Sequence, residues 1–356
     1  MIDPIPHHPP VGAPGDLILV LNCGSSSIKF ALFDAGVAPV PRTALWKGKV
    51  QGVGGPSPDF GETGIPPFPV SLDGPDPYAA ALKVIRDRVV ARLDGRRLIA
   101  VAHRVVHGGK RYFEPTVVTG QVLADLGGLI PLAPLHQPFA LDAMRILLAE
   151  RPELLQVACF DTAFHHSLPR VEQMMPLSWW AWEKGLRRYG FHGLSYDYIA
   201  TALAERHGRE AAGRARTIVA HLGSGASLCA LKDLRSVATT MGFSALDGLM
   251  MGTRSGAVDP GAVLYLMEIE KLSLEEVGHA LYHNSGLLGI SGLSSDPRVL
   301  LAHENDPGER GERVRAALAL YVRRIVREVG GLASLLGGLD MLVFTAGIGE
   351  HSVALR

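Results

Sequence analysis

Two segments, one in each half of the chain, follow the same plan, and this repetition limits the folds that the chain can adopt. Residues 18–33 (ILVLNCGSSSIKFALF) and 217–232 (TIVAHLGSGASLCALK) each contain an apolar strand, a polar residue, a Gly/Ser turn and a second apolar strand. The polar residue is Asn22 in the first copy and His221 in the second. A duplicated fold, with two similar loops facing one cleft, would produce this pattern. Two unrelated hairpins remain the alternative, because short Gly/Ser similarity arises easily by chance.

The other segments alternate between strand and helix patterns, which is typical of an α/β chain. The expected strands are 17–22, 28–33, 98–109, 156–164, 217–222, 227–231 and 340–350, the last running into a glycine turn, and the expected helices are 77–93, 138–149, 193–207, 259–272 and about 309–329. Asp259 is the expected N-cap of its helix, with proline just inside the helix start. We expect a disordered N-terminal tail over 1–16, an N-terminal domain over 17–161 and a C-terminal domain over 162–356.

Length and charge exclude several classes of protein. The 356 residues suffice for two domains, and the hydrophobic fraction of 47% can supply a core for each. The 35 basic and 35 acidic residues balance, whereas a protein that binds nucleic acid or an anionic membrane surface needs a basic excess. No apolar run approaches the roughly 18 residues of a membrane span, and the proline-rich N-terminus lacks the pattern of a signal peptide. The three cysteines are expected to be buried thiols in a reducing cytoplasm.

The first Gly/Ser turn, at Gly24 to Ser27, has two interpretations. Backbone N–H groups at glycines and serine hydroxyls can converge on an anion, and the following Lys29 would add positive charge. The spacing differs from that of the G-x-x-x-x-G-K-[ST] phosphate loop, and a strand follows where that loop has a helix. On the residues alone, a phosphate cradle and a plain hairpin both remain open.

Two arginines and one acid lie at positions that suit ligand binding. Arg104 follows an apolar strand and Arg254 lies among glycines, where guanidinium groups can bind a carboxylate or phosphate with two hydrogen bonds. A structural salt bridge is the alternative for either arginine. Asp161 ends a buried strand, where carboxylates face ligands in open α/β sheets. The histidines lack metal-site spacing, so zinc is not expected, and we assign His165 and His166 to the surface or to a helix cap.

Long stretches between about residues 17 and 352 resemble one family, and they occur in that family's order. They are LVLNCGSSSIKF, HRVVHGG, PLAPLHQP, CFDTAFH, RRYGFHG, AHLGSGAS, MGFSALDGLMMGTRSGAVDP, SGLLGISGLSSDPR and VFTAGIGEHS. With these stretches the chain resembles the acetokinase family of the ASKHA phosphotransferase superfamily (acetate and sugar kinases, Hsc70, actin). The resemblance implies an α/β fold of two ASKHA domains, with a duplicated βββαβαβα core and an interdomain cleft.

The resemblance also assigns roles to individual residues. It places Asn22 near Mg²⁺, and Ser25, Ser27 and Lys29 near the transferred phosphoryl group. Further assigned residues are Arg104 and Arg254, which hold the carboxylate and phosphoryl oxygens, the essential acid Asp161, and the active-site histidines His136 and His192. The nucleotide set comprises His221, Gly223, Ser224 and Gly225 at the ATP phosphates, Asp296 and Arg298 at the adenosine, and an adenosine loop at Ala346–Glu350 that includes Gly347, Ile348, Gly349 and Glu350. The walls of the pocket for the substrate methyl group are Val106, Leu135, Phe191 and Ala245.

The implied activity is that of an acetate kinase, which reversibly transfers a phosphoryl group from ATP to acetate and forms acetyl phosphate and ADP. The implied metal is Mg²⁺ or Mn²⁺, and the implied protein is a cytoplasmic homodimer without nucleic-acid or membrane partners. A carboxylate substrate is already ionised at pH 7, so the difficulty lies in bringing two anions together. Phosphoryl transfer of this kind depends on positioning and on positive charge at the oxygens of the phosphoryl group.

The sequence departs from the family pattern inside the expected site. Ser224 stands in the second Gly/Ser turn where the family usually has asparagine, which shortens one polar contact. Leu194 and Tyr196 replace two polar side chains of the family, so the segment after His192 is expected to lose polar contacts. Ala245 replaces a usual pocket proline, which would admit one more carbon. Because a methylene in such a pocket is worth only ~1–3 kcal/mol, propionate is an expected secondary substrate.

The C-terminal domain is expected to be shortened relative to the family. Family members continue beyond the position of residue 356, with a glutamate that helps to place Mg²⁺ and a helix that returns to the first domain. The alternatives to an acetate kinase are therefore a propionate or short-chain acyl kinase, or a nucleotide-binding protein of low activity. A sugar kinase or an Hsp70-like ATPase is disfavoured by the paired arginines and the narrow apolar pocket.

Overall fold

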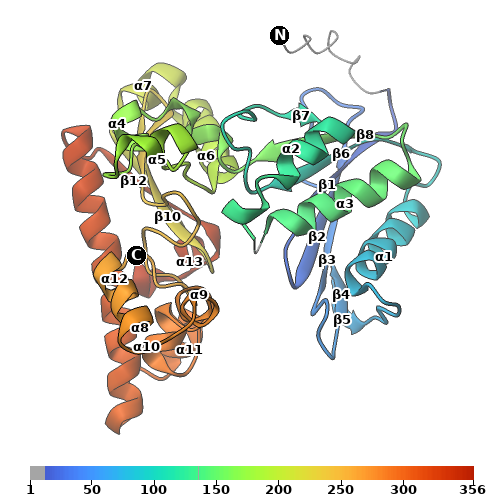
Figure 1. The fold of residues 1–356 in the computed structure, drawn as a ribbon. Helices are drawn as coiled ribbons and strands as arrows, with labels where there is room; N and C mark the ends of the chain where they lie inside the picture. Colours follow the sequence, from blue (N-terminus) through green and yellow to red (C-terminus); the bar gives the residue numbers. More distant parts are fainter. Residues whose placement is uncertain (1–12, 135) are drawn as a thin grey trace. The chain divides into compact units, whose positions relative to one another are not determined.

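The computed structural model describes residues 13–134 and 136–356, and these form two compact units (Figure 1). Unit 1 extends to Phe160 and unit 2 begins at Asp161, one residue before the second domain placed from the sequence. Residues 1–12 of the expected tail lie outside the described residues. Asp16, which the sequence analysis included in that tail, is buried in the first strand, and its carboxylate forms an ion pair with Arg97 at 2.9 Å.

Unit 1 is built on an eight-stranded sheet in the order β5-β4-β3-β2-β1-β6-β8-β7. Its strands are β1 (Asp16–Cys23), β2 (Ser27–Asp34), β3 (Trp46–Gln51), β4 (Asp59–Glu62), β5 (Ile65–Pro69), β6 (Arg97–Val105), β7 (Thr116–Val117) and β8 (Leu155–Phe160). Its helices are α1 (Pro77–Ala91), α2 (Gly120–Gly127), the 3₁₀ turn η1 (Ile130–Leu132) and α3 (Gln137–Glu150). The hairpin β1–β2 is antiparallel, whereas β6 runs parallel to β1 and β8 runs parallel to β6.

Helices α1 and α3 pack on the sheet of unit 1 and on each other, with the rings of Tyr78 and Phe139 centred 5.3 Å apart (Figure 1). Helix α1 begins at this place because the Asp76 carboxylate accepts the first free backbone N–H groups and Pro77 needs no N–H partner. The alternating apolar residues of β1 and β2 point into the core under these helices. The core therefore fixes the register of β1, and with it the place where β1 ends.

Unit 2 is built on a four-stranded sheet in the order β11-β10-β9-β12. Its strands are β9 (Thr217–Leu222), β10 (Ala226–Lys232), β11 (Arg235–Thr239) and β12 (Met341–Thr345). Its helices are η2 (Ala163–Ser167), α4 (Arg170–Gln173), α5 (Trp179–Lys184), α6 (Gly193–His207), α7 (Arg209–Arg214), α8 (Pro260–Glu268), α9 (Leu274–His283), α10 (Gly286–Ser291), α11 (Pro297–Ala302), α12 (Gly308–Leu336), α13 (Ala346–His351) and η3 (Val353–Leu355). No helix in the described part of the chain combines the length and hydropathy needed to span a bilayer.

The two sheets repeat one plan, so the similarity of the two hairpin segments is a structural repeat. In unit 1 the antiparallel pair β1–β2 has β6 as a parallel neighbour, and in unit 2 the pair β9–β10 has β12. The polar residue before each turn also has an equivalent cross-strand position, because Asn22 pairs with Lys29 and His221 pairs with Ser227. This arrangement confirms the expected two-domain α/β fold with a duplicated core.

Some element ends differ from the sequence-based expectation. The segment after β12 forms the short helix α13 where a glycine turn was expected, and the Glu350 carboxylate accepts the Ala346 N–H at its start, at 3.1 Å. Helix α8 ends at Glu268, before Lys271 takes a left-handed conformation with φ 60°. At the other end of α8, Asp259 accepts from the Gly261 N–H at 2.8 Å, which confirms the expected N-cap.

Candidate active site

In unit 1, parallel pairing brings two of the expected site residues together. Strands β1 and β6 run in the same direction with Leu21 opposite His103, so their next residues, Asn22 and Arg104, lie at the same edge of the sheet. Arg104 Nη1 donates a hydrogen bond to Asn22 Oδ1 at 3.1 Å. Lys29 lies directly across from Asn22 in β2. This edge of the sheet therefore presents two cationic side chains beside one amide oxygen.

The first Gly/Ser turn closes a regular hairpin. The Gly24 N–H donates to the Ser27 carbonyl at 2.9 Å, so this backbone donor is already used within the turn. Ser25 lies exposed at the tip and Ser27 is half-buried at the start of β2. The Gly24 amide is therefore not available to an anion at this turn, whereas the serine hydroxyls and Lys29 remain candidates for anion binding.

The expected substrate-pocket residues of unit 1 are positioned by one glutamine that the sequence analysis did not identify. Gln137 is fully buried; its side chain accepts from the His107 N–H at 3.1 Å and donates to the His107 carbonyl at 3.0 Å. This clamp joins the loop that carries the buried Val106 to the start of α3, where His136 is the N-cap residue. Leu135, the other expected wall residue, lies outside the described residues.

His107 does not serve as an acid near neutral pH. It is fully buried, and this burial lowers its pKa to about 4, because removal from water disfavours the imidazolium form. Its Nδ1 accepts from the Gly109 N–H at 2.9 Å. The neutral ring thus holds the turn after β6.

In unit 2, β12 pairs in parallel with β9 and brings two expected nucleotide segments side by side. Thr345 pairs with His221, and a Cβ added to Gly223 would lie 3.6 Å from the Ala346 Cβ. The expected adenosine loop thus begins beside the second Gly/Ser turn. The added Cβ position of Gly347 has open space around it, whereas that of Gly349 lies 3.4 Å from the Ala220 carbonyl oxygen.

The last two residues of this loop have different surroundings. Ile348 is half-buried, and its carbonyl accepts the Ser352 N–H at 2.9 Å. The Glu350 carboxylate caps the helix start, with further contact to the Thr345 hydroxyl at 3.4 Å. The carboxylate of Glu350 is therefore directed back toward its own backbone.

The second Gly/Ser turn lies against the expected histidine and arginine. A Cβ added to Gly225 would lie 3.2 Å from His192 Nε2 and 3.7 Å from Arg254 Nη1. The backbone of Ser224 accepts from the Gly252 N–H at 3.4 Å, which ties the turn to the loop that carries Arg254. Gly225, His192 and Arg254 thus form one cluster with an imidazole nitrogen and a guanidinium group at the surface of a glycine turn.

Backbone contacts hold the Arg254 loop in place. The Met251 N–H donates to the Arg254 carbonyl at 3.1 Å, and the Ser285 N–H donates to the Thr253 carbonyl at 2.9 Å. The guanidinium donates through Nη1 to the Ala245 carbonyl at 3.0 Å. Burial lowers the pKa of Arg254 from its usual value, but an arginine remains a cation at neutral pH.

Asp161 lies next to His192 through the backbone. It is buried, and its carbonyl accepts the Gly193 N–H, the first in α6, at 2.8 Å. A Cβ added to Gly193 would lie 2.1 Å from this carbonyl oxygen, so only glycine permits the close approach. His192 itself has φ 60°, and this left-handed conformation turns the chain into α6.

The rings of His192 and His221 stack with centroids 4.1 Å apart and planes inclined by 16°. His192 Nδ1 hydrogen-bonds Ser227 Oγ at 2.8 Å, and His221 Nδ1 hydrogen-bonds Ser195 Oγ at 2.9 Å. Neither serine was predicted from the sequence as a site residue. The hairpin register could have identified Ser227, because it lies directly across from His221.

Tyr196 corrects the expectation that the segment after His192 loses polar contacts. Its hydroxyl hydrogen-bonds Ser227 Oγ at 2.5 Å, and the side chain is fully buried. The assignment of His165 to the surface or a cap was also wrong. His165 is buried, with Nδ1 at 2.8 Å from Ser236 Oγ and Nε2 at 2.9 Å from the carbonyl of Phe191, an expected pocket residue that is itself buried.

The expected adenosine residues Asp296 and Arg298 bond each other. The Asp296 carboxylate accepts from Arg298 Nη2 at 2.6 Å and from the Arg298 backbone N–H at 2.9 Å, which caps α11. The hydrogen bonds from Arg298 hold the pKa of Asp296 below its usual value. A Cβ added to Gly252 would lie 3.3 Å from the Ser295 Cβ and 3.7 Å from the Ser224 carbonyl oxygen, so this segment lies beside the second turn.

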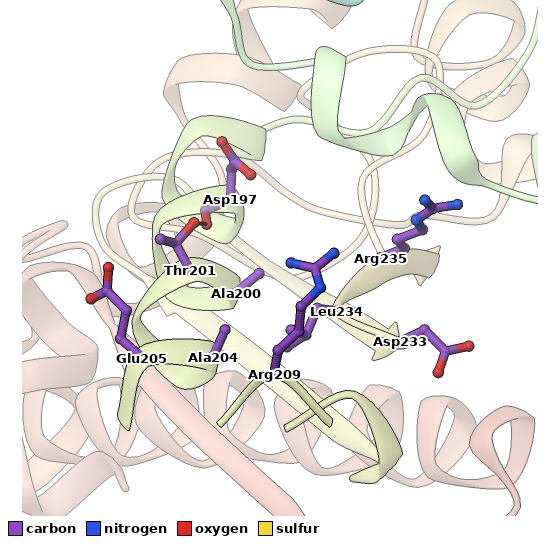
Figure 2. Close-up of a pocket in the computed structure, with 9 residues that line it drawn as sticks. All are labelled: Asp197, Ala200, Thr201, Ala204, Glu205, Arg209, Asp233, Leu234 and Arg235. Carbon is purple, nitrogen blue, oxygen red and sulfur yellow. Dashed lines mark hydrogen bonds between the residues drawn. The ribbon is translucent and has the colours of Figure 1, made fainter. Parts of the chain in front are cut away.

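A separate hollow of about 330 Å³ in unit 2 contains none of the expected residues (Figure 2). Its lining comes from α6, the start of α7 and the turn between β10 and β11: Asp197, Ala200, Thr201, Ala204, Glu205, Arg209, Asp233, Leu234 and Arg235. Figure 2 shows the acidic side chains of Asp197 and Glu205 on α6 and the basic side chains of Arg209 and Arg235 on the other side of the hollow. The hollow and the polar cluster at Gly225 therefore have no residue in common.

The comparisons with known sequences point to one family. Residues 17–356 match the model of the acetokinase family. The chain is 48% identical to the acetate kinase of Rhodopseudomonas palustris (strain TIE-1), over 96% of this chain and 84% of that protein. It is 44% identical to the acetate kinase of Methylocella silvestris, over 95% of this chain and 84% of that protein.

Solved structures of two kinases that act on short-chain acids resemble this chain over most of its length. The acetate kinase of Porphyromonas gingivalis superposes with a TM-score of 0.82 at 34% identity, covering 96% of this chain and 85% of that chain. A propionate kinase from Francisella tularensis superposes with a TM-score of 0.86 at 33% identity, covering 96% and 86%. The chain therefore belongs to the acetokinase family.

Proposed function

We propose that the protein is an acetate kinase, which transfers the terminal phosphoryl group of ATP to acetate and forms acetyl phosphate and ADP, reversibly. The observation that carries this proposal is the cluster at Gly225, where His192 Nε2 and Arg254 Nη1 approach the same point of a glycine turn. An imidazole nitrogen and a fixed cation at that point suit an oxygen of a transferring phosphoryl group. Gly225 leaves room there that any side chain would fill.

The reaction needs positive charge at the reacting oxygens rather than a general base that removes a proton. Acetate is ionised at neutral pH, so no proton has to be removed before it attacks the phosphorus atom. The family motifs assign two arginines to this chemistry, Arg104 beside Asn22 and Arg254 at the glycine turn that contains Gly225. We assign them to the carboxylate and phosphoryl oxygens, where they offset the repulsion between the two anions.

The nucleotide is assigned to the segments that meet in unit 2. The turn at Gly223 to Gly225 would receive the phosphates, and the helix start at Ala346 together with Asp296 and Arg298 would receive the adenosine. These contacts are carried over from the family motifs and are supported by the adjacency of the segments.

The residues present also fit a magnesium ion that enters with the nucleotide. No group of three or more His, Cys, Asp or Glu side chains in the described part of the chain could hold a metal by itself. Mg²⁺ bound to nucleotide phosphates needs few protein ligands, and oxygen donors suit it. Asn22 Oδ1 would contribute one such oxygen, because a carbonyl oxygen that accepts from Arg104 retains a second lone pair. When bound, the metal would supply further positive charge at the phosphate oxygens.

Propionate is a second candidate substrate. Ala245 stands at an expected wall of the methyl pocket, where a small side chain leaves space for one more carbon. The structural similarity to a propionate kinase supports the same possibility. We propose acetate as the preferred acid and propionate as a slower one.

The test is ATP-dependent formation of acyl phosphate, trapped as the hydroxamate with hydroxylamine, for acetate, propionate and butyrate. Arg254→Gln should lose most of the activity, whereas Arg206→Gln, at an exposed arginine near the end of α6, should retain it. Folded wild-type protein that yields no hydroxamate with any of the three acids would refute the proposal. Nucleotide binding by calorimetry without product would instead favour a nucleotide-binding protein of low activity.

We also propose that the protein is a cytoplasmic homodimer that associates through α8. None of the nine residues of this helix is buried, and Leu264 and Tyr265 within it and the C-cap residue Ile269 are 52–61% exposed although all three are largely apolar. Light scattering after size exclusion should give a dimer for the wild type and a monomer for Ile269→Glu. The control is Val326→Glu, at a similarly exposed valine of α12, which should remain dimeric. A monomeric wild type would refute the assignment.

A further inference from the structure

The two stacked histidines are held by a reciprocal pair of serines. His192 lies at the start of α6 and bonds Ser227 of β10, while His221 of β9 bonds Ser195 of α6. The start of α6 and the hairpin β9–β10 therefore each supply one imidazole and one hydroxyl. Because both bonds use Nδ1, the two rings have the same edge fixed, and the Nε2 atom of His192 is left on the side of the Gly225 turn.

Tyr196 extends this arrangement by one buried hydroxyl. Its side chain and that of Ser227 are both 0% exposed, and the two oxygens lie 2.5 Å apart. Within the described residues, Ser227 is the only hydrogen-bond partner of the Tyr196 hydroxyl. A phenol with a single partner donates to it, because otherwise its hydrogen would be buried without an acceptor. Burial also raises the pKa of Tyr196 well above its usual value, so the hydroxyl keeps its proton.

The direction of the first hydrogen bond sets the direction of the second. If Tyr196 donates to Ser227 Oγ, the single hydrogen of Ser227 is available for His192 Nδ1, which then accepts it. A neutral imidazole that accepts at Nδ1 carries its proton at Nε2. The imidazolium form would bring a second donor to Ser227 Oγ and leave the serine hydrogen without a partner. The guanidinium of Arg254, near the same Gly225 position as Nε2, also disfavours a second positive charge.

We propose that Tyr196 and Ser227 are positioning residues that hold His192 as the neutral tautomer with its proton on Nε2. His192 thereby presents a hydrogen-bond donor at the Gly225 turn, beside Arg254. The identity of the acceptor, a phosphoryl oxygen, rests on the proposed function. The tautomer itself does not rest on it, and the two can therefore be tested separately.

The first experiment is long-range ¹H–¹⁵N correlation NMR of histidine-labelled protein at pH 7.5, which distinguishes the two neutral tautomers and the imidazolium. The His192 signals are assigned from the spectrum of His192→Gln. We expect the Nε2–H form in the wild type, and a mixture of forms in Tyr196→Phe, where Ser227 is free to reverse its hydrogen bond. Tyr198→Phe, at an exposed tyrosine on the same helix, is the matched control and should leave the spectrum unchanged.

Two results would overturn the proposal: an Nδ1–H or imidazolium form of His192 in the wild type, or an unchanged tautomer in Tyr196→Phe. If Tyr196→Phe does not fold, Ser227→Ala tests the same point, since it removes the donor to Nδ1 directly. The wild-type spectrum is decisive in either case.

The second experiment measures acyl phosphate formation by the same variants. A positioning role predicts that kcat falls about 3- to 10-fold in Tyr196→Phe, the range for one hydrogen bond, while KM for acetate stays within about twofold. A 3- to 10-fold rise in KM for acetate with unchanged kcat would contradict that role. If the wild type forms no acyl phosphate, the proposed function fails, but the NMR result still decides the tautomer.

Discussion

The sharpest test of the candidate site is the replacement of Gly225 by alanine. The added Cβ would lie 3.2 Å from His192 Nε2 and 3.5 Å from Cε1, so the ring has to move by a few tenths of an ångström. That movement is resisted by the 2.8 Å bond to Ser227 and by the stacked ring of His221. The new methyl group would also occupy the point that we assign to a phosphoryl oxygen, next to Arg254.

We expect Gly225→Ala to lower kcat/KM strongly and to change the free energy of unfolding little. The methyl group takes the place assigned to the phosphoryl oxygen, and a misplacement of about 1 Å at a reacting group costs about 100-fold in rate, so kcat/KM should fall by that factor, or about 2.7 kcal/mol of transition-state stabilisation. Gly225 does not have a positive φ, and alanine reduces the entropy of the unfolded chain, which contributes about 0.4–1 kcal/mol of stability. This gain offsets much of the crowding, so the free energy of unfolding should change by less than about 1 kcal/mol.

The assay is hydroxamate formation from acetate and ATP, combined with urea unfolding of the same samples. The matched control is Gly330→Ala in α12, where an added Cβ meets no atom within 4 Å. This change should leave kcat/KM unaltered and stabilise the protein by about 0.5–1 kcal/mol. Wild-type kcat/KM in Gly225→Ala would refute the placement of the phosphoryl group, and a loss of several kcal/mol of stability would show that the effect is not local.

Three further changes test the framework around the site. Gly193→Ala places a Cβ 2.1 Å from the Asp161 carbonyl oxygen, so urea unfolding should show a loss of at least about 1–3 kcal/mol, and an unchanged midpoint would contradict the close contact. Gln137→Ala removes the buried hydrogen bonds to the N–H and the carbonyl of His107, and a thermal melt should show a loss of about 1–3 kcal/mol. Hydrogen bonds from Arg216 hold the pKa of Asp340 well below its usual value, so its stabilisation is present above the unfolded-state pKa of about 4 and is lost as pH falls through the lower folded pKa. Asp340→Asn should therefore be less stable than the wild type in urea at pH 7, with a smaller difference at pH 3; an equal difference at both pH values would contradict this linkage.

Local patterns in the sequence were sufficient to predict the fold class and much of the secondary structure. The two apolar–turn–apolar segments became the hairpins β1–β2 and β9–β10, because alternation of side chains and a tight turn depend only on neighbouring residues. The N-cap at Asp259 was predicted correctly for the same reason, since a capping carboxylate needs only the next few backbone N–H groups.

The motifs also predicted residues that the fold brings together within each unit. Asn22 and Arg104 bond each other in unit 1, and His192 lies with Arg254 at the Gly225 turn in unit 2. Parallel strands end at one edge of a sheet, so polar residues that follow such strands meet there.

Only the tertiary structure decided which buried side chains share a hydrogen bond. His165 was assigned to the surface or a cap, yet a serine of β11 and a carbonyl before α6 enclose its ring. Tyr196 was expected to remove a polar contact, but its hydroxyl meets Ser227 in the core. Such pairs join segments that are distant in the chain, and a buried polar group must find its partner wherever the packing of the sheet and helices places one. Periodicity and composition describe only neighbouring residues, so they could not predict these hydrogen bonds between distant segments.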